Sequence, residues 1–92
     1  MLNRIILIGR LTRDPELRFT TNGTAVCSFT LAVDSGFGEN KRTDFINIVV
    51  WNKQGENCAT YLSKGKLAAV DGRLQIRSYD GKDGVKRYVT EV

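Results

Sequence analysis

Over residues 24–34, apolar side chains at every second position alternate with mostly polar ones, and this feature most limits what the chain can fold into. Every second residue from Ala25 to Val33 is apolar, whereas Thr24, Ser28 and Thr30 fall on the other side. Successive side chains of a β-strand point to opposite faces, so a period of two indicates a strand with one buried face. The stretch therefore predicts a half-buried strand of an antiparallel sheet, with Cys27 on the inner side.

Four more stretches have strand patterns. Residues 2–11 are apolar on both sides in the middle, which is typical of a strand in the interior of a sheet. Residues 43–51 and 66–79 each have one complete aliphatic face, and a last strand begins near Val85 and is incomplete at Val92. These stretches predict a chain built mainly of β-strands.

Turn signals separate the strands. Pro15 predicts a turn or loop over "RDPELR", and Asn22-Gly23 predicts a tight hairpin turn. A Gly-rich polar loop is expected over residues 35–42, and "YDGKDG" predicts a second hairpin turn. The connections are therefore short, as in a small antiparallel fold.

One helical pattern lies within residues 53–65, between the third and fourth strands. We expect two to three turns, with Asn52 as a cap at the start and Lys64-Gly65 at the end. The side chains expected to plug a core are Cys58, Tyr61 and Leu62.

Length and composition fit one small globular domain. The chain has 92 residues, of which 41% are hydrophobic and 26% charged. Five antiparallel strands with one short helix between strands 3 and 4 describe the OB-fold barrel. We therefore predict an all-β, five-stranded OB-fold barrel that forms a single domain over residues 1–92.

The residue types argue against an enzyme. The chain has no histidine, which excludes histidine-based catalysis, and its two cysteines cannot complete a zinc site alone. The acidic residues are scattered, so a metal-dependent nuclease is disfavoured, and we expect no metal and no cofactor. The apolar run at residues 5–9 is too short for a signal peptide or a membrane span. We expect a reduced cytoplasmic protein with both cysteines buried.

The third and fourth strands also carry an unusual outward face. On the third strand this face has Phe45 and Trp51, six residues apart or roughly 20 Å in a strand. The outward residues of the fourth strand are Arg73, Gln75, Arg77 and Tyr79. Aromatic rings stack on bases and cations neutralise phosphates, so this face favours single-stranded nucleic acid, an interpretation that the net charge of +4 permits.

Other interpretations of these residues remain open. The two aromatic rings on the third strand could be buried under another subunit. Tyr79 could be an ordinary aromatic residue at a strand end, and Phe37 could anchor its own loop. The arginines of the fourth strand could simply be a solvated face. Only their combination on two strands that flank the same helix favours nucleic-acid binding.

The sequence as a whole resembles the bacterial single-stranded DNA-binding protein (SSB) family. The motifs that carry the resemblance are "MLNRIILIGRLTRDPELRFTTNG", "TAVCSFTLAV", "DFINIVVWNKQGENCATYLSKG", "VDGRLQIRSY" and "RYVTEV". They cover the chain apart from the loop at residues 35–42. The resemblance implies an OB-fold that assembles into a homotetramer and wraps single-stranded DNA with little sequence preference. It also implies a cytoplasmic, nucleoid-associated role in DNA replication, recombination and repair.

The resemblance further implies which residues contact DNA. The family positions that stack on bases fall on Phe37, Phe45, Trp51 and Tyr79. The family's basic contacts map to Arg4, Arg10, Lys53, Lys64, Arg73 and Arg77. Charge alone adds three more candidates, which are Arg18, Lys41 and Arg42.

Two departures from the family pattern matter. The chain has Phe or Tyr at several positions where Trp is familiar, which implies weaker stacking at each of them. The family usually continues into a flexible linker and an acidic tail that recruits replication and repair proteins, and neither is present before Val92. Such partners are expected only if a tail exists beyond this chain. The alternative function is an SSB-related primosome or assembly protein that uses the aromatic face for protein contacts.

Overall fold

The computed structural model describes residues 1–36, 38–80 and 86–91, with residues 77–80 and 86–91 described as backbone only. The strands are β1 (Ile5–Leu11), β2 (Glu16–Phe19), β3 (Ala25–Ser35), β4 (Arg42–Trp51), β5 (Leu67–Gly72), β6 (Gln75–Asp80) and β7 (Lys86–Glu91). Among these residues there is one α-helix, α1 (Asn52–Tyr61), and one short 3-10 turn, η1 (Gly38–Asn40). The predicted "YDGKDG" turn lies largely outside the described residues.

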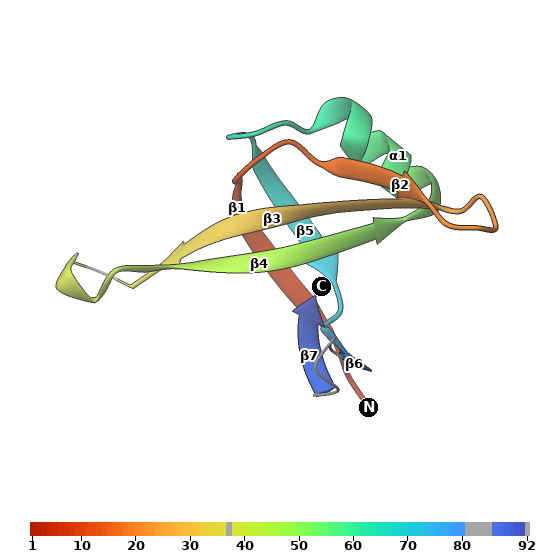
Figure 1. Cartoon of the computed structure of the whole chain (residues 1–92). Helices are drawn as coiled ribbons and strands as arrows, with labels where there is room; N and C mark the ends of the chain where they lie inside the picture. The colour runs from red at the N-terminus through yellow and green to blue at the C-terminus, as the bar shows by residue number, and fades with distance from the viewer. Residues whose placement is uncertain (37, 81–85, 92) are drawn as a thin grey trace.

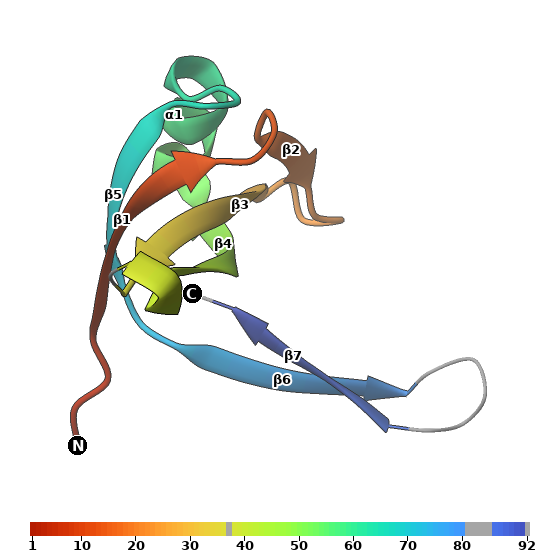
Figure 2. The same ribbon diagram turned by 90° about the vertical axis from the view of Figure 1, so that its left-hand side faces the viewer.

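Five strands form one antiparallel sheet around β3. Its order is β2-β3-β1-β5, and β4 pairs with β3 along nearly its whole length (Figure 1). β6 and β7 form a separate two-stranded sheet, which projects at the end of the molecule opposite α1 (Figure 2). No pairing among the described residues closes the five-stranded sheet into a complete barrel. The architecture is mainly β with one helix and is consistent with an OB-fold.

The buried core confirms the predicted inner faces of β3 and β4. The residues almost entirely shielded from solvent include Leu11, Cys27, Phe29, Leu31 and Ile48. Those from β3 follow every second position, as the alternation predicted, and Ile46 and Val50 of β4 pack against them. The period-two pattern thus fixes which side chains hold the sheet together.

Helix α1 packs closely on the sheet. A Cβ atom at Gly55 would lie 2.6 Å from the carbonyl oxygen of Val50, so only glycine permits this approach. Cys58 and Leu62 pack against the core as predicted. The prediction for Tyr61 is wrong, because its side chain is 69% exposed. Leu62 follows the last helical residue with an extended backbone and packs against the core, whereas the Tyr61 side chain stays in solvent.

The predicted helix ends are also wrong. Trp51 precedes the helix without a side-chain capping bond, and Asn52 is the first helical residue with a φ of +62°. The helix ends at Tyr61, so Gly65 does not cap it. Gly65 instead adopts a φ of +85° in the following turn, where its N–H donates a hydrogen bond to the carbonyl of Leu11.

Two further strand predictions need correction. Residues 16–18, assigned to a loop, belong to β2, because this edge strand after Pro15 can pair with β3. The predicted strand over residues 66–79 is broken into β5 and β6. At the break, the Asn3 side chain donates to the carbonyl of Leu74 at 2.8 Å and accepts from its N–H at 2.9 Å. Asn3 thus takes the place of a strand partner at this bend.

Among the described residues, no helix has the length and apolar character that crossing a membrane requires.

Candidate nucleic-acid interface

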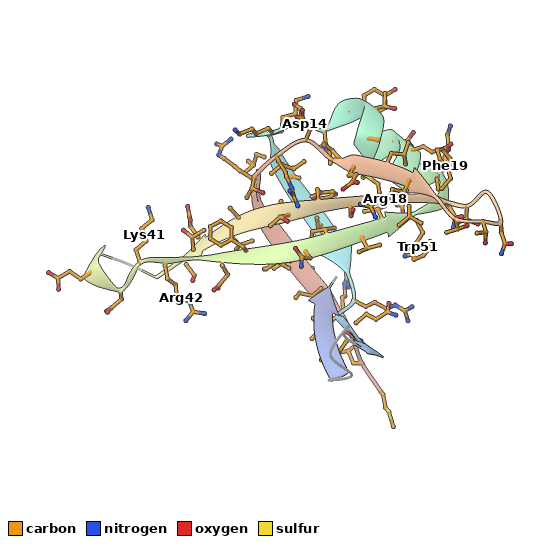
Figure 3. The ribbon with its side chains drawn as sticks, viewed as in Figure 1. Asp14, Arg18, Phe19, Lys41, Arg42 and Trp51 are labelled. Carbon is orange, nitrogen blue, oxygen red and sulfur yellow. The ribbon has the colours of Figure 1, made fainter. Side chains whose placement is uncertain are left out.

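The strand register places Trp51 in one cross-strand row with an arginine. Trp51 lies opposite Val26 of β3, and Val26 lies opposite Arg18 of β2. Directly opposed residues of antiparallel strands share a face, so the three form one row. The Trp51 side chain is 51% exposed. Figure 3 shows Trp51 and Arg18 near the same end of the β3–β4 pair.

A second row repeats the combination. Phe45 lies opposite Ala32, and Ala32 lies opposite Arg10 of β1. The Phe45 side chain is 68% exposed. Between the two aromatic residues, the Thr30 hydroxyl donates a hydrogen bond to Asn47 Oδ1 at 3.2 Å. The outward face of the sheet therefore presents two separate rings, each with a cation in its row.

A hollow of about 760 Å³ lies beside Trp51, between the end of β4 and the β5–β6 bend. It brings together three residues that the sequence predicted for the site, Arg18, Trp51 and Arg73. Side-chain amides that the prediction omitted also line it, namely those of Asn52, Gln54 and Gln75. The signal for Gln75 was its shared strand face with Arg73. Polar groups that can reach base edges thus border a ring that can stack on a base.

Three of the predicted arginines are paired with carboxylates. Arg4 donates two hydrogen bonds to Asp71, Nε to Oδ1 at 3.1 Å and Nη2 to Oδ2 at 2.7 Å. The other two pairs are Arg18 with Glu16 and Arg42 with Asp44. All three pairs are solvent-exposed, so solvent screens them and each contributes little to stability. A phosphate can therefore compete for these guanidinium groups.

The Arg4–Asp71 pair changes both pKa values. Hydrogen bonding to Arg4 lowers the pKa of the Asp71 carboxyl, and hydrogen bonding to Asp71 raises the pKa of Arg4. The stability that this pair supplies is present above the ordinary aspartate pKa. It is lost as the pH falls through the lowered pKa of Asp71. At neutral pH the pair is fully charged.

The other predicted cations are spread widely. Arg10 Nη1 donates to the carbonyl of Gly65 at 3.0 Å, and Lys53 Nζ lies 3.9 Å from Glu56. Lys64 is exposed in the turn after α1. Lys41 and Arg42 lie at the end of the β3–β4 pair far from Trp51 (Figure 3). The structure therefore does not gather all of the cations around one ring.

Some predicted residues lie partly or wholly outside the described residues. Phe37 is not described. Arg77 and Tyr79 are described as backbone only, in β6 opposite Val89 and Arg87 of β7. Their assignment to the interface stays a prediction.

The two cysteines are free thiols. Burial raises the pKa of Cys27 and of Cys58, so both are protonated at neutral pH. Within residues 1–36, 38–80 and 86–91, no cluster of three or more His, Cys, Asp or Glu side chains could hold a metal ion.

The geometry agrees with what comparison to known proteins shows. Residues 2–92 match the single-strand binding protein family. The chain belongs to this family. It is 60% identical over its full length to a single-stranded DNA-binding protein of Bacillus cereus, of which it covers 56%. A protein of the same name from Halalkalibacterium halodurans is 61% identical, again over the full chain and 56% of that protein.

A third relative is the single-stranded DNA-binding protein 3 of Clostridium acetobutylicum. It is 62% identical over 99% of the chain and 65% of its own length. The chain thus spans little more than half the length of most of these relatives. The family match confirms the resemblance found in the sequence motifs.

Proposed function

We propose that this protein binds single-stranded DNA, with little sequence preference, on the outward face of β2, β3 and β4. The observation that carries the proposal is the pair of exposed rings, Phe45 and Trp51, each in a cross-strand row with an arginine. Stacking on a ring contributes about 1–3 kcal/mol per base and accepts every base, because every base has a π-face. The three relatives described above are named single-stranded DNA-binding proteins, which supports the proposal.

The proposed contacts fall into two classes. The rings that stack on bases are Phe37, Phe45, Trp51 and Tyr79. The residues that contact phosphates are Arg4, Arg10, Arg18, Lys41, Arg42, Lys53, Lys64, Arg73 and Arg77. The activity requires no bond-making chemistry, so we propose a binding protein and not an enzyme. It would protect single strands during DNA replication, recombination and repair, in association with the nucleoid.

We also propose a complete OB-fold barrel that assembles into a homotetramer. In support of the barrel, β7 lies in contact with β4, across the side that strand pairing leaves open. In support of assembly, Ile6 and Ile8 on the outward face of β1 are 62% and 61% exposed. An exposed apolar patch of this kind typically marks an interface. Replication and repair proteins are proposed as partners only through a segment beyond this chain.

The proposal can be tested by removing each ring. Phe45→Ala and Trp51→Ala should each weaken binding to labelled oligo(dT), measured by fluorescence anisotropy, by about fivefold or more. Asn47→Ala is the matched control, since Asn47 lies between the rings on the same face. The mass from light scattering should not change in any variant. Unchanged affinity in both ring variants, or dissociation of the assembly in place of lost DNA binding, would contradict the proposal.

A further inference from the structure

The outer face of α1 carries a row of exposed side chains that leads away from Trp51. Lys53, Asn57 and Tyr61 are four residues apart, so they follow one side of the helix. The opposite side carries Gly55 and Ala59, which meet the sheet. The row therefore begins beside Trp51 and ends with the Tyr61 ring, which is 69% exposed.

Four exposed cations lie on residues 10–14 and 64–66, two segments that hydrogen bonds hold together just after α1. They are Arg10, Arg13, Lys64 and Lys66. Lys66 Nζ donates to the carbonyl of Tyr61 at 2.9 Å, and Arg10 Nη1 donates to that of Gly65 at 3.0 Å. Among the described residues none of the four cations makes an ion pair, in contrast to Arg4, Arg18 and Arg42.

One acidic residue belongs to this cluster. Asp14 Oδ1 accepts a hydrogen bond from the backbone N–H of Lys64 at 2.9 Å and helps to hold the turn against the end of β1. Four cations against this one carboxylate leave a clear positive excess. An exposed aromatic ring beside such an excess is the combination that binds single-stranded nucleic acid, as on the sheet face.

We propose that a bound DNA strand continues from Trp51 along the outer face of α1, and that Tyr61 stacks on a base there. This inference rests on the proposed function and extends its site. Ten helical residues at about 1.5 Å each span roughly 15 Å, slightly less than the separation of Phe45 and Trp51 along β4. The phosphates beside that base are neutralised by Lys64 and Lys66, and Lys53 is at the start of the path.

The chemistry of this face favours nucleic acid over a protein partner. A helix face that docks on a protein presents apolar anchors three and four residues apart. Here the single ring shares its row with Lys53 and Asn57, which are exposed and polar. The excess of positive charge at this end of α1 complements a polyanion. The row also continues from the Trp51 end of the sheet, where we propose that DNA binds.

The test compares Tyr61→Ala with Tyr61→Phe on oligo(dT) strands of increasing length, with Trp51 emission as the reporter. Tyr61→Ala should weaken binding about fivefold or more for strands long enough to extend beyond the sheet face. Tyr61→Ala should not change the affinity for the shortest strands that still quench Trp51 emission. Tyr61→Phe keeps the ring and should bind like the unchanged protein. Thr60→Ala, an exposed neighbour on the helix, should have no effect.

Three outcomes would overturn the inference. The first is equal affinity of Tyr61→Ala and the unchanged protein at every length. The second is a changed mass of Tyr61→Ala in light scattering, which would place the ring in a subunit contact. The third is that light-induced crosslinking of 5-iodouracil-substituted oligonucleotides to the unchanged protein never yields a Tyr61 adduct in mass spectrometry. If Trp51 emission did not respond to any strand, the proposed function itself would fail.

Discussion

At Asp71, the fold joins a carboxylate to an arginine that lies 67 positions earlier in the sequence. The resemblance to the family assigned Arg4 to phosphate binding, but no local pattern could show that its charge is shared with Asp71. Arg18 and Arg42 differ in this respect, because their partners Glu16 and Asp44 lie only two residues away on the same strand face. At the residue scale, the interface contains cations that an acidic neighbour holds in place and partly neutralises.

Removing that neighbour should strengthen DNA binding. Asp71→Asn leaves the Arg4 guanidinium without its carboxylate, so it is available to a phosphate. The plot of log affinity against log salt concentration should become steeper by up to about 0.7, the value for one more contact with a single strand. The double variant Arg4→Gln/Asp71→Asn should lose the gain. An identical salt dependence in Asp71→Asn and the unchanged protein would show that Arg4 does not contact DNA.

At the scale of elements, β4 has a buried aliphatic face and an exposed face to which we assign DNA binding. Ile46, Ile48 and Val50 point into the core, whereas Phe45 and Trp51 are exposed. A strand that only stabilised the sheet would have a polar outer face. Helix α1 begins directly after this strand, and Gly55 lets it approach the backbone of Val50 closely.

Two substitutions on this strand should affect different properties, one the stability of the fold and the other the affinity for DNA. Ile48→Ala removes a fully buried side chain and should lower the free energy of unfolding by about 2–5 kcal/mol, measured by urea denaturation. Phe45→Ala, three residues away on the outer face, should change stability by about 0.5 kcal/mol or less and yet weaken DNA binding. Comparable losses of stability in both variants would contradict the assignment of the two faces.

The faces of β3 and β4 were predictable from sequence because a period of two is a local property. β2 was not, since four residues after Pro15 form a strand only through pairing with β3. The β5–β6 break was hidden for a similar reason. Residues 66–79 keep their alternation through it, and the bend depends on Asn3, 71 positions away. The candidate site shows the same difference. The outward positions of Phe45 and Trp51 follow from the local alternation, but their rows with Arg10 and Arg18 depend on how the strands pair.

At the scale of the whole molecule, the part of the chain that the structure describes leaves apolar side chains of β1 exposed. Ile8 lies opposite Ala69 of β5 and Ile6 opposite Asp71, so the outward side of β1 and β5 is only partly polar. A domain of about this size buries only about 60–65% of its unfolded surface, and covering this face by other copies would add to its stability. The proposed homotetramer would therefore cover apolar side chains that a single chain leaves exposed to water.

A charge on this face should break the assembly. Ile8→Glu places a carboxylate where we propose a subunit contact, and burying it would carry a large desolvation cost. Light scattering should show a lower mass than that of the unchanged protein. Thr60→Glu makes the same charge change at an exposed position on α1 and should keep the mass. An unchanged mass in Ile8→Glu would locate the interface elsewhere.

The most direct test of the central claim is a titration of the protein with poly(dT), followed by tryptophan emission. Trp51 is the only tryptophan of the chain, so the signal reports one position. Stacking of bases on Trp51 should quench the emission in a saturable way, and added salt should reverse the quenching as phosphate contacts are lost. Emission that stays constant while anisotropy shows the DNA to be bound would contradict the account, because the strand would then not pass over the outward face of β4.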